Sequence, residues 1–466
     1  MRSKARKFVL PLYLLLGACM PVAPTNDTAT RAASPASMGA DSALPPMKSF
    51  SVPRPQAPVS SNSDMARDFL DLAFTLESGR PLPILTRFEG PITVRVSGPA
   101  PVSLTPDLNR LLHRLRNEAG INISMTGNAQ ANINVQAVSR ADIRKALPSA
   151  ACFVVPNVSS LKEYMAARRT KQTSWSQLKK RERLTIFLPA DAAPQEVRDC
   201  LHEELAQAIG PLNDLYRLPD SVFNDDNVHT VLTGFDMMIL RAYYDPSLST
   251  GMTRSQVADR LPSIFARINP RGQGGTPKRL AKTPRIWIDA VQTALGPGAN
   301  PAQRRQAATE ALKVASAMGW SDHRRAFSHY AMGRLLQSVD PAAAQDHFVL
   351  AQRYFGNAPE TALHRAYVAS QLAAYAISAG RADDALYLLQ AHLDTAMVHE
   401  NAALLATLMM LRAEALDLAG RPTEARSVRL DSLGWARYGF GSDWAVRAKL
   451  REVGSLNPAR RRLGAL

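Results

Sequence analysis

The chain has 466 residues and carries 56 Lys and Arg against 40 Asp and Glu, so its formal net charge at pH 7 is +16. It contains neither the glycine-rich loop with Lys-Ser/Thr that binds phosphate nor a Cys/His spacing typical of zinc sites, which excludes P-loop nucleotide-binding proteins and zinc fingers. A chain of this length holds two or three domains of ordinary size.

The first residues predict export. Four basic residues precede an apolar run at 8–18 that is too short to span a bilayer. The run ends in Leu-Gly-Ala-Cys, which resembles the lipobox of bacterial lipoproteins. That resemblance implies a signal peptide over 1–18 and a lipid on Cys19, whereas the alternative is an ordinary cleaved signal peptide. Because Met20 rather than Asp follows the cysteine, the lipoprotein rule favours the outer membrane of a Gram-negative host, facing the periplasm or the cell surface.

Residues 19–63 are rich in Pro, Ser and Ala and poor in large apolar residues, so we expect a disordered tether that holds the folded part away from the membrane. In an exported protein the positive charge favours an anionic envelope polymer or lipid as partner over nucleic acid. An ordinary solvated surface explains the same charge.

From 64 to 265 the pattern alternates strands and helices and predicts an α+β domain. Period-two alternation predicts a strand at 91–98, and an amphipathic pattern predicts a helix at 104–120 with Thr105 as N-cap and Gly120 at its end. Further strands are expected at 121–127, 131–139, 152–157 and 183–190, followed by a helix at 200–210.

The helix at 200–210 carries the candidate site. In the zinc-protease spacing HExxHxxGxxH, three His hold the metal and the Glu activates water. Counting back from Gly210 puts Glu204 at the catalytic position. The ligand positions then fall on Glu203, Gln207 and either Asn213 or Asp214, with His202 or His229 as further candidates to complete the shell.

Two interpretations of this frame remain open. Carboxylate and amide oxygens favour hard cations over zinc, so a working site would be an unusual metal-dependent hydrolase. Without a metal, Glu203 and Glu204 complement the dipole of the helix, and Gln207 forms hydrogen bonds in the former metal cavity.

The segment at 221–252 extends the pattern, with Thr233 expected to cap a final helix, Asp236 in its first turn and a Gly-Met exit. Strand, helix, several strands and then a ligand-bearing helix is the order of a zincin catalytic domain. Residues 85–265 therefore resemble the zincin-like, metzincin-type metallopeptidase-related domains of unknown function found in exported bacterial proteins. The resemblance implies a hydrolase fold, although the His residues that define the motif are absent.

Two cysteines remain after Cys19. In an oxidising compartment, Cys152 and Cys200 are expected to form one disulfide, which would stabilise the fold by roughly 4 kcal/mol through loop closure. The alternative places Cys200 beside His202 as a metal ligand.

A basic run at 168–183 holds seven Lys or Arg and one Trp. It is either a mobile loop that grips an anionic partner, with the Trp supplying stacking, or a solvated surface loop. The candidate binding residues are Arg168, Arg169, Trp175, Lys179, Lys180 and Arg181.

After a linker and connecting helix at 266–300, residues 301–455 are expected to be helical and repetitive, with a basic tail at 456–466. Similar segments begin at Asp340, Arg381 and Arg421, and small residues recur at the same spacing at Ala344, Ala385 and Ala425. This region resembles tetratricopeptide-like solenoids, which implies a concave groove for a protein or peptide partner.

Together these patterns predict an exported envelope lipoprotein in which a degenerate zincin-like domain and an all-α helical-repeat domain form a binding or assembly scaffold with no cofactor. The alternative is a metal-dependent peptidase or amidase that acts on envelope protein or peptidoglycan and holds a single divalent metal ion.

Overall fold

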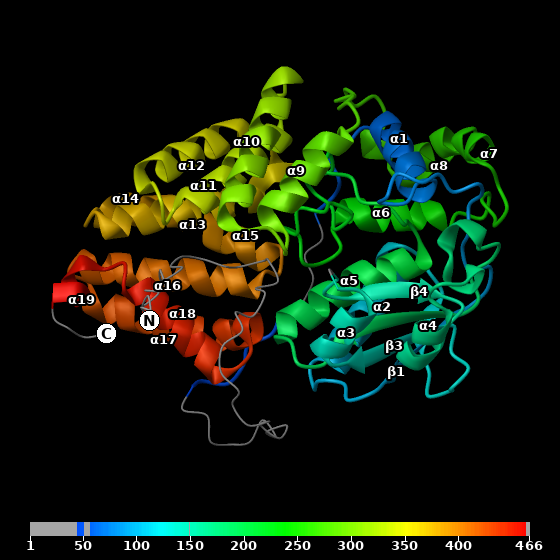
Figure 1. Cartoon of the computed structure of the whole chain (residues 1–466), viewed down its shortest axis with the longest axis horizontal. Coiled ribbons are helices and arrows are strands. Elements are labelled where there is room, and N and C mark those ends of the chain that lie inside the picture. The colour runs from blue at the N-terminus through cyan, green and yellow to red at the C-terminus, as the bar shows by residue number, and fades with distance from the viewer. Residues whose placement is uncertain (1–43, 51–55, 149, 463–466) are drawn as a thin grey trace, which may run out of the picture.

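The computed structural model describes residues 44–50, 56–148 and 150–462 (Figure 1). An α/β region with a five-stranded mixed sheet is followed by a long all-helical region. The predicted signal peptide and Cys19 lie outside the described residues. Within the described ranges, no helix combines the length and the apolar character needed to cross a membrane.

The sheet has the strand order β2-β1-β3-β5-β4. Neighbouring strands are parallel except for β4, which pairs antiparallel with β5 at one edge. All five predicted strands are confirmed, as β1 (Ile92–Ser97), β2 (Ile123–Met125), β3 (Ile133–Val138), β4 (Phe153–Pro156) and β5 (Leu184–Pro189).

Helices cover both faces of this sheet, which explains why β5 is buried along its whole length. Ile186 and Leu188 face the main core under α5, whereas Phe187 faces a smaller cluster with α3. The helices of the region are α1 (Asn62–Ala73), α2 (Leu104–Glu118), α3 (Arg140–Ala146), α4 (Leu161–Ala167), α5 (Pro194–Ile209), α6 (Gly234–Tyr243), α7 (Arg254–Ala258) and α8 (Leu261–Ile268), with short 3₁₀ turns η1 (Lys171–Thr173), η2 (Trp175–Gln177) and η3 (Pro270–Gly272).

Three helix boundaries can be compared with the predictions. Thr233 caps α6 in a reciprocal capping box with Asp236, as predicted. Helix α2 ends before Gly120, whose φ is +69°, but it begins at Leu104, so Thr105 lies inside the first turn and is not the cap. Leu104 is fully buried, and its packing places the N-cap at Ser103, two residues before Thr105. Helix α5 begins six residues before the predicted start, because Pro194 fits its first turn.

The helical region forms a succession of packed pairs. Helices α12, α14 and α17 begin directly after Asp340, Arg381 and Arg421. The predicted small contact residues, Ala344, Ala385 and Ala425, are all completely buried. The region comprises α9 (Arg285–Leu295), α10 (Pro301–Ala317), α11 (His323–Leu336), α12 (Pro341–Phe355), η4 (Pro359–Thr361), α13 (Ala362–Ser378), α14 (Ala382–Gln390), α15 (His392–Val398), α16 (Ala402–Leu418), α17 (Pro422–Phe440), α18 (Asp443–Gly454) and α19 (Pro458–Arg462).

The predicted tether and tail are shorter than expected. Phe50, which the sequence analysis placed in the tether, is buried against Trp435 with ring centroids 4.7 Å apart. At the other end, Asn457 is buried and donates a hydrogen bond from Nδ2 to Glu414 Oε2 at 3.1 Å. Residues 44–50 also contact α17 through their backbone: Lys48 N–H donates to the carbonyl of Gly434 at 3.0 Å, and Arg437 donates to the carbonyl of Pro45 at 2.9 Å.

Helix α5 lies between the sheet and the helical region, in contact with β4, β5, α2 and α17. Arg198 on this helix is completely buried and donates from Nη2 to the carbonyl oxygen of Glu400 at 2.5 Å. Tyr438 of α17 donates its hydroxyl to Asp107 of α2 at 2.7 Å. Buried polar groups therefore join the two regions beside α5, where the guanidinium of Arg198 lies 5.2 Å from the ring centroid of Tyr438.

The predicted disulfide is confirmed: Cys152 and Cys200 are bonded, with their Cα atoms 5.9 Å apart. The bond connects the start of β4 to the middle of α5, so Cys200 is not available as a metal ligand. It closes a loop with a sequence separation of 48 residues and fixes the helix that carries the candidate site.

Replacing both cysteines by serine should lower the free energy of unfolding by about 4 kcal/mol, because the unfolded chain loses a long closed loop. Urea denaturation of the oxidised protein and the double variant measures the difference. As a control, the unmodified protein is treated with a reductant to break the disulfide. It should then unfold like the double variant. An unchanged unfolding midpoint in both would contradict a stabilising role for this bond.

Candidate functional site

The end of α5 is set by close packing. A Cβ atom on Gly210 would lie 2.7 Å from Cδ2 of Leu240 on α6. Its φ is −145°, so glycine serves the close approach of α6 here and not a left-handed turn. The glycine that fixes the register of the motif therefore has a packing role at the helix exit.

Arg181 caps the same end of α5. It donates from Nη1 to the carbonyl oxygens of Gln207 and Ala208 at 2.7 and 2.8 Å, and from Nη2 to that of Gly210 at 2.5 Å. Its side chain is buried and complements the negative end of the helix dipole. The prediction that Arg181 binds an anionic partner is corrected by this position.

The middle of the basic run is held against the fold at Gln172 and Trp175. The side chain of Asn157 donates to the carbonyl of Gln172 at 2.9 Å, and Gln172 returns a bond of 2.9 Å to the carbonyl of Asn157. Trp175 is half-buried beneath the guanidinium of Arg181, 5.4 Å from its ring centroid, so it is no open stacking platform.

The other predicted binding residues lie closer to the surface. Arg168 donates to the carbonyl of Ala146 at 3.0 Å, and Lys180 pairs with Glu182 at 2.7 Å. Arg169, Lys179 and Lys180 have exposed side chains. Those three are the members of the predicted set that solvent reaches freely.

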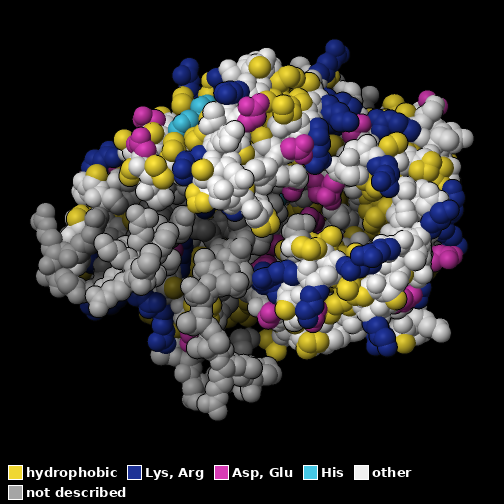
Figure 2. Space-filling view, viewed as in Figure 1, with side chains coloured by type: hydrophobic (Ala, Val, Ile, Leu, Met, Phe, Trp, Pro, Cys, Tyr) yellow, Lys and Arg dark blue, Asp and Glu magenta, His cyan; other side chains and the backbone are white. Residues whose placement is uncertain are grey.

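The structure brings a group of acidic residues together at the carboxyl half of α5. We name it the carboxyl cluster; it consists of Glu77, Glu203, Glu204, Asp214 and Asp225. Glu77, from the loop after α1, is hydrogen-bonded to the side chains of Asp214 and Gln207. Two carboxyl groups can share such a bond only when one of them holds a proton. On the face in Figure 2, acidic side chains gather beside a hollow.

Burial and mutual repulsion raise the pKa of these carboxyl groups. The pKa of Glu203 is raised to about 8, first by burial and then by the charges of Glu77 and Asp225. Burial and the same neighbours raise the pKa of Asp214 well above its ordinary value. The cluster therefore carries less negative charge at neutral pH than five isolated carboxylates would, because Glu203 retains its proton there.

Glu204, the predicted catalytic residue, is buried at 5% exposure beneath the edge strand. It accepts a backbone hydrogen bond from Val154 of β4, and its Oε2 has no hydrogen-bond partner among the residues that the structure describes. Burial, followed by the charges of Glu203 and Glu77, raises its pKa well above the ordinary value. A carboxyl group kept neutral in this way can donate a proton, which is what a general acid requires.

Of the two alternatives for the third ligand, Asp214 lies at the cluster and Asn213 does not. Asn213 donates from Nδ2 to the carbonyl of Asp71 at 2.9 Å, which ties the chain to α1. His202 is buried and accepts the N–H of Leu232 on its Nδ1 at 3.0 Å, so it serves the fold rather than a metal shell at this site.

The predicted metal ligands do not converge on one point. Over the described part of the chain, one group of three or more His, Cys, Asp or Glu places its ligand atoms within 4.8 Å of one another, and it is Asp220, His229 and His399. Glu203, Glu204 and Asp214 do not belong to it. The frame at α5 thus brings carboxyl groups near one another without forming a compact ligand set.

The helical region contributes to the edge of the carboxyl cluster. Gln292 of α9 donates from Nε2 to Asp225 at 2.8 Å, and the hydroxyl of Tyr216 donates to the same carboxylate at 3.0 Å. The sequence analysis missed Glu77 and Asp225, because neither belongs to the HExxH spacing and both reach the cluster only through the fold.

Residues 62–263 match the family model described as "Protein of unknown function (DUF2927)". A DUF2927 domain of unknown function therefore spans these residues, and the helical region follows it. Neither the curated proteins nor the solved structures contain a match to the chain.

Replacing Glu203 with Gln should change how stability depends on pH. The folded carboxyl holds its proton up to about pH 8, whereas the unfolded one releases it near 4.5, so the stability of the unmodified protein falls as pH rises between these values. Glu203→Gln should reduce this fall and gain on the order of 1–2 kcal/mol at pH 8, with little change at pH 4.

Thermal or urea unfolding from pH 4 to pH 8.5 measures this effect. Asp383→Asn, which changes an exposed carboxylate on α14, is the matched control and should leave the slope unaltered. An identical pH slope in the Glu203→Gln variant and the unmodified protein would show that Glu203 ionises normally.

Proposed function

We propose that the protein is an exported envelope lipoprotein whose DUF2927 domain and helical repeats act together as a binding scaffold. The lipid on Cys19 anchors it to the outer membrane, and a protein or peptide partner binds the repeats. The domain has a zincin-like frame, supported by the succession of strand, helix, strands and α5. At the ligand positions this frame carries carboxyl and amide groups in place of imidazoles.

The observation that carries the proposal is a pocket in the repeats. It has a volume of about 240 Å³ and lies between α12, α13 and α14. Leu372, Ala376 and Leu388 give it an apolar lining, and the ion pair between Arg381 and Asp384, at 2.9 Å, stands at its rim. This combination suits a partner segment that inserts an apolar side chain and forms polar contacts around it.

Tyr387 marks the same pocket. Its side chain is 82% exposed, the highest value among the exposed large hydrophobic residues of the described chain. An aromatic residue held open beside a pocket contributes large contact area at little entropic cost when a partner binds. We therefore assign Tyr387 as the principal partner contact.

The scaffold is rigid across the two regions, because Arg198, Gln195 and Asp107 of the DUF2927 domain form buried hydrogen bonds with the helical region. A partner held by the repeats is thereby placed at a fixed position relative to the carboxyl cluster.

A photo-crosslinking amino acid at position 387 should give a discrete crosslinked product in intact cells that make the protein. The same residue at position 430, which is also exposed but lies on α17, is the matched control and should not give this product. The crosslinking amino acid placed instead at position 384, on the rim of the same pocket, should capture a product as well. Adding Tyr387→Ala to that variant should abolish the product without lowering the unfolding temperature. No product at 387, or the same products at both positions, would contradict partner binding at this pocket.

The second candidate function is a metal-dependent peptidase or amidase acting on envelope protein or peptidoglycan. The neutral, buried carboxyl of Glu204 favours it, because such a group can donate a proton during bond cleavage.

Elemental analysis of protein purified from the periplasm without chelators separates the two functions. If the protein is a scaffold, Glu203→Ala and Gln207→Ala leave the metal content unchanged. Glu204→Gln then has no effect on any hydrolysis of peptidoglycan or peptides. Loss of about one metal ion per chain in both alanine variants would instead favour the hydrolase.

A further inference from the structure

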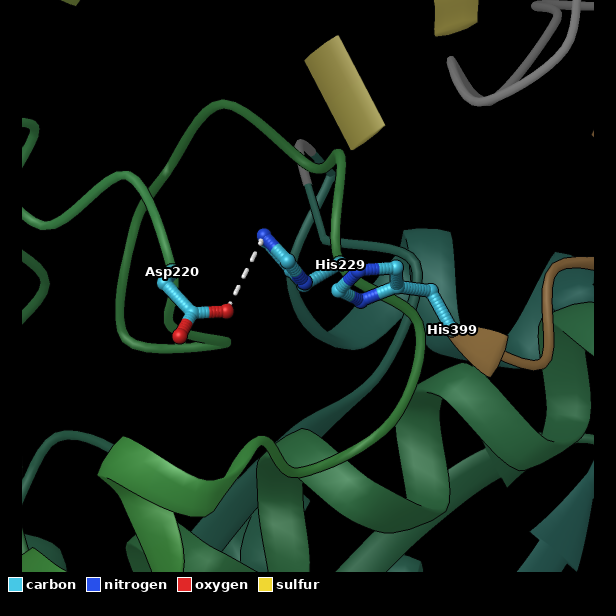
Figure 3. A group of neighbouring side chains, drawn as sticks. All are labelled: Asp220, His229 and His399. Carbon is cyan, nitrogen blue, oxygen red and sulfur yellow. Dashed lines mark ion pairs between the residues drawn. The ribbon is translucent and has the colours of Figure 1, made fainter. Parts of the chain in front are cut away.

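Asp220, His229 and His399 meet where the DUF2927 domain contacts the helical repeats (Figure 3). Asp220 and His229 belong to the segment between α5 and α6, and His399 directly follows α15. The three side chains come from both regions of the protein and are separated by up to 179 positions in the sequence, from 220 to 399.

The geometry of this group is close to that of a metal site. One ligand atom of each residue lies within 4.8 Å of those of the other two. In Figure 3 the imidazole of His229 points toward the carboxylate of Asp220, and the distance from Nε2 to Oδ1 is 3.9 Å. Two ligands at about 2.0 Å from a tetrahedral zinc ion are about 3.3 Å apart, so the ligand atoms need to approach one another by at most about 1.5 Å, which side-chain rotation can supply.

The donor atoms suit a transition metal. Two imidazoles and one carboxylate are a ligand set that zinc accepts, whereas magnesium and calcium prefer oxygen alone.

The surroundings leave room for an ion and a water molecule. A cavity of about 30 Å³ borders the group and is lined by Asp220, His399 and Glu400, among others. The side chain of His229 is only 2% exposed. Three protein ligands beside such a cavity leave the fourth coordination position to water.

The backbone on both sides holds these residues in place. Glu400, next to His399, has a φ of +50°, a conformation that costs energy in a residue other than glycine and that occurs often at functional sites. On the domain side, Asp236 accepts hydrogen bonds from Ser221 and from the N–H of Val222, which orders the segment after Asp220.

A second histidine–carboxylate pair lies beside the group. His364 is hydrogen-bonded to Asp226 at 2.8 Å, and its ring centroid is 6.0 Å from that of His229. Three of the nine histidines in the chain therefore gather at one boundary between the two regions.

We propose that Asp220, His229 and His399 bind one zinc ion that fastens the DUF2927 domain to the helical repeats. This site lies apart from the carboxyl cluster and does not depend on the function proposed above. Its role is structural: the ion replaces the contact between two imidazoles and a half-buried carboxyl group by three coordinate bonds across the boundary.

The alternative is a purely hydrogen-bonded arrangement. Nε2 of His229 donates to the carbonyl oxygen of Pro219 at 2.9 Å, which orders the ring without a metal. The two arrangements differ in whether added zinc stabilises the protein and in whether His399 is required.

The test uses the purified full chain, stripped with a chelator and titrated with zinc chloride. We expect about one zinc ion per chain and a rise of a few degrees in unfolding temperature. His399→Ala should weaken zinc binding at least about 100-fold and abolish the thermal shift. His392→Ala removes a half-buried histidine from α15, the helix that precedes His399, and should leave both unchanged.

Two further measurements test whether zinc binds at these three residues. Cobalt in place of zinc should give visible absorption bands typical of a low-coordinate site, lost in His399→Ala and in His229→Gln but kept in Glu203→Ala. Folding of each variant is checked without metal by circular dichroism. Absence of stoichiometric binding, or zinc retained by both histidine variants, would overturn the proposal. Zinc lost in Glu203→Ala and kept in His399→Ala would place the metal at α5 instead and contradict the scaffold function.

Discussion

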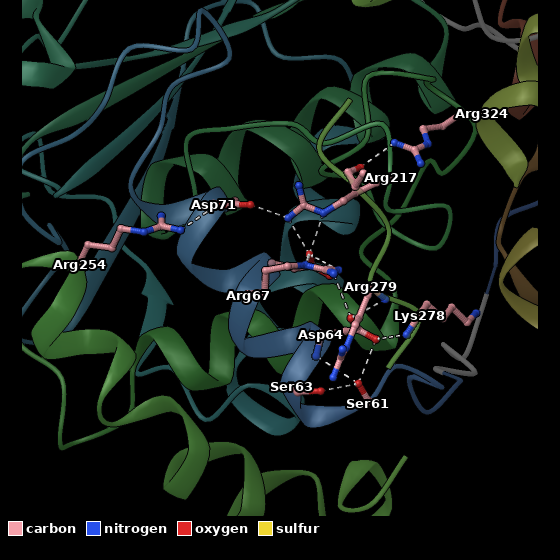
Figure 4. A network of polar contacts seen from close by, with 12 residues as sticks. Ser61, Ser63, Asp64, Arg67, Asp71, Arg217, Arg254, Lys278, Arg279 and Arg324 are labelled. Atoms are coloured by element: carbon pink, nitrogen blue, oxygen red, sulfur yellow. Dashed lines mark hydrogen bonds and ion pairs between the residues drawn. The ribbon is translucent and has the colours of Figure 1, made fainter. Parts of the chain in front are cut away.

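Three buried guanidinium groups fix α5 and the chain around it, and the rest of the structure depends on them. Arg181 holds the carbonyls at the end of the helix, and Arg198 holds the turn at Glu400 in the repeats. Arg217 fastens the segment after the helix to Asp68 and Asp71 of α1 (Figure 4). A buried cation is costly unless it is fully paired, so each of these arginines selects one arrangement of its partners.

The carboxyl cluster follows from how these charges are distributed. The guanidinium of Arg181 is directed at backbone oxygens, and that of Arg217 at the carboxylates of α1. Arg285 lowers the pKa of Glu77 and Asp225 in part, but burial outweighs it and both values stay raised. With so little compensating charge, burial and repulsion raise the pKa of both Glu203 and Asp214. A site that held a cation permanently would place its carboxylates closer together, as Asp220 and the two histidines are placed.

Local patterns predicted the elements, whereas contacts between distant segments decided the sites. Strand alternation and the recurrence at Ala344, Ala385 and Ala425 report which side chains face the core, and those predictions hold. The position of Phe50 could not be read from a Pro-rich segment, because its partner Trp435 lies far along the chain. Likewise, His229 and His399 form no spacing motif; they meet only because α15 ends against the loop before α6.

The helical region also contributes contacts to the carboxyl cluster, which does not depend on the DUF2927 domain alone. Tyr216 donates its hydroxyl to Asp225, accepts the imidazole N–H of His323 on its carbonyl, and packs against Trp287 with ring centroids 5.0 Å apart. Gln292 reaches the same carboxylate from α9. Because the helical region supplies part of the hydrogen-bonding that keeps Asp225 in place, any shift of α9 or α11 changes the electrostatic environment of Glu203. The DUF2927 domain and the helical region are therefore coupled at this point through the side chains that surround Asp225.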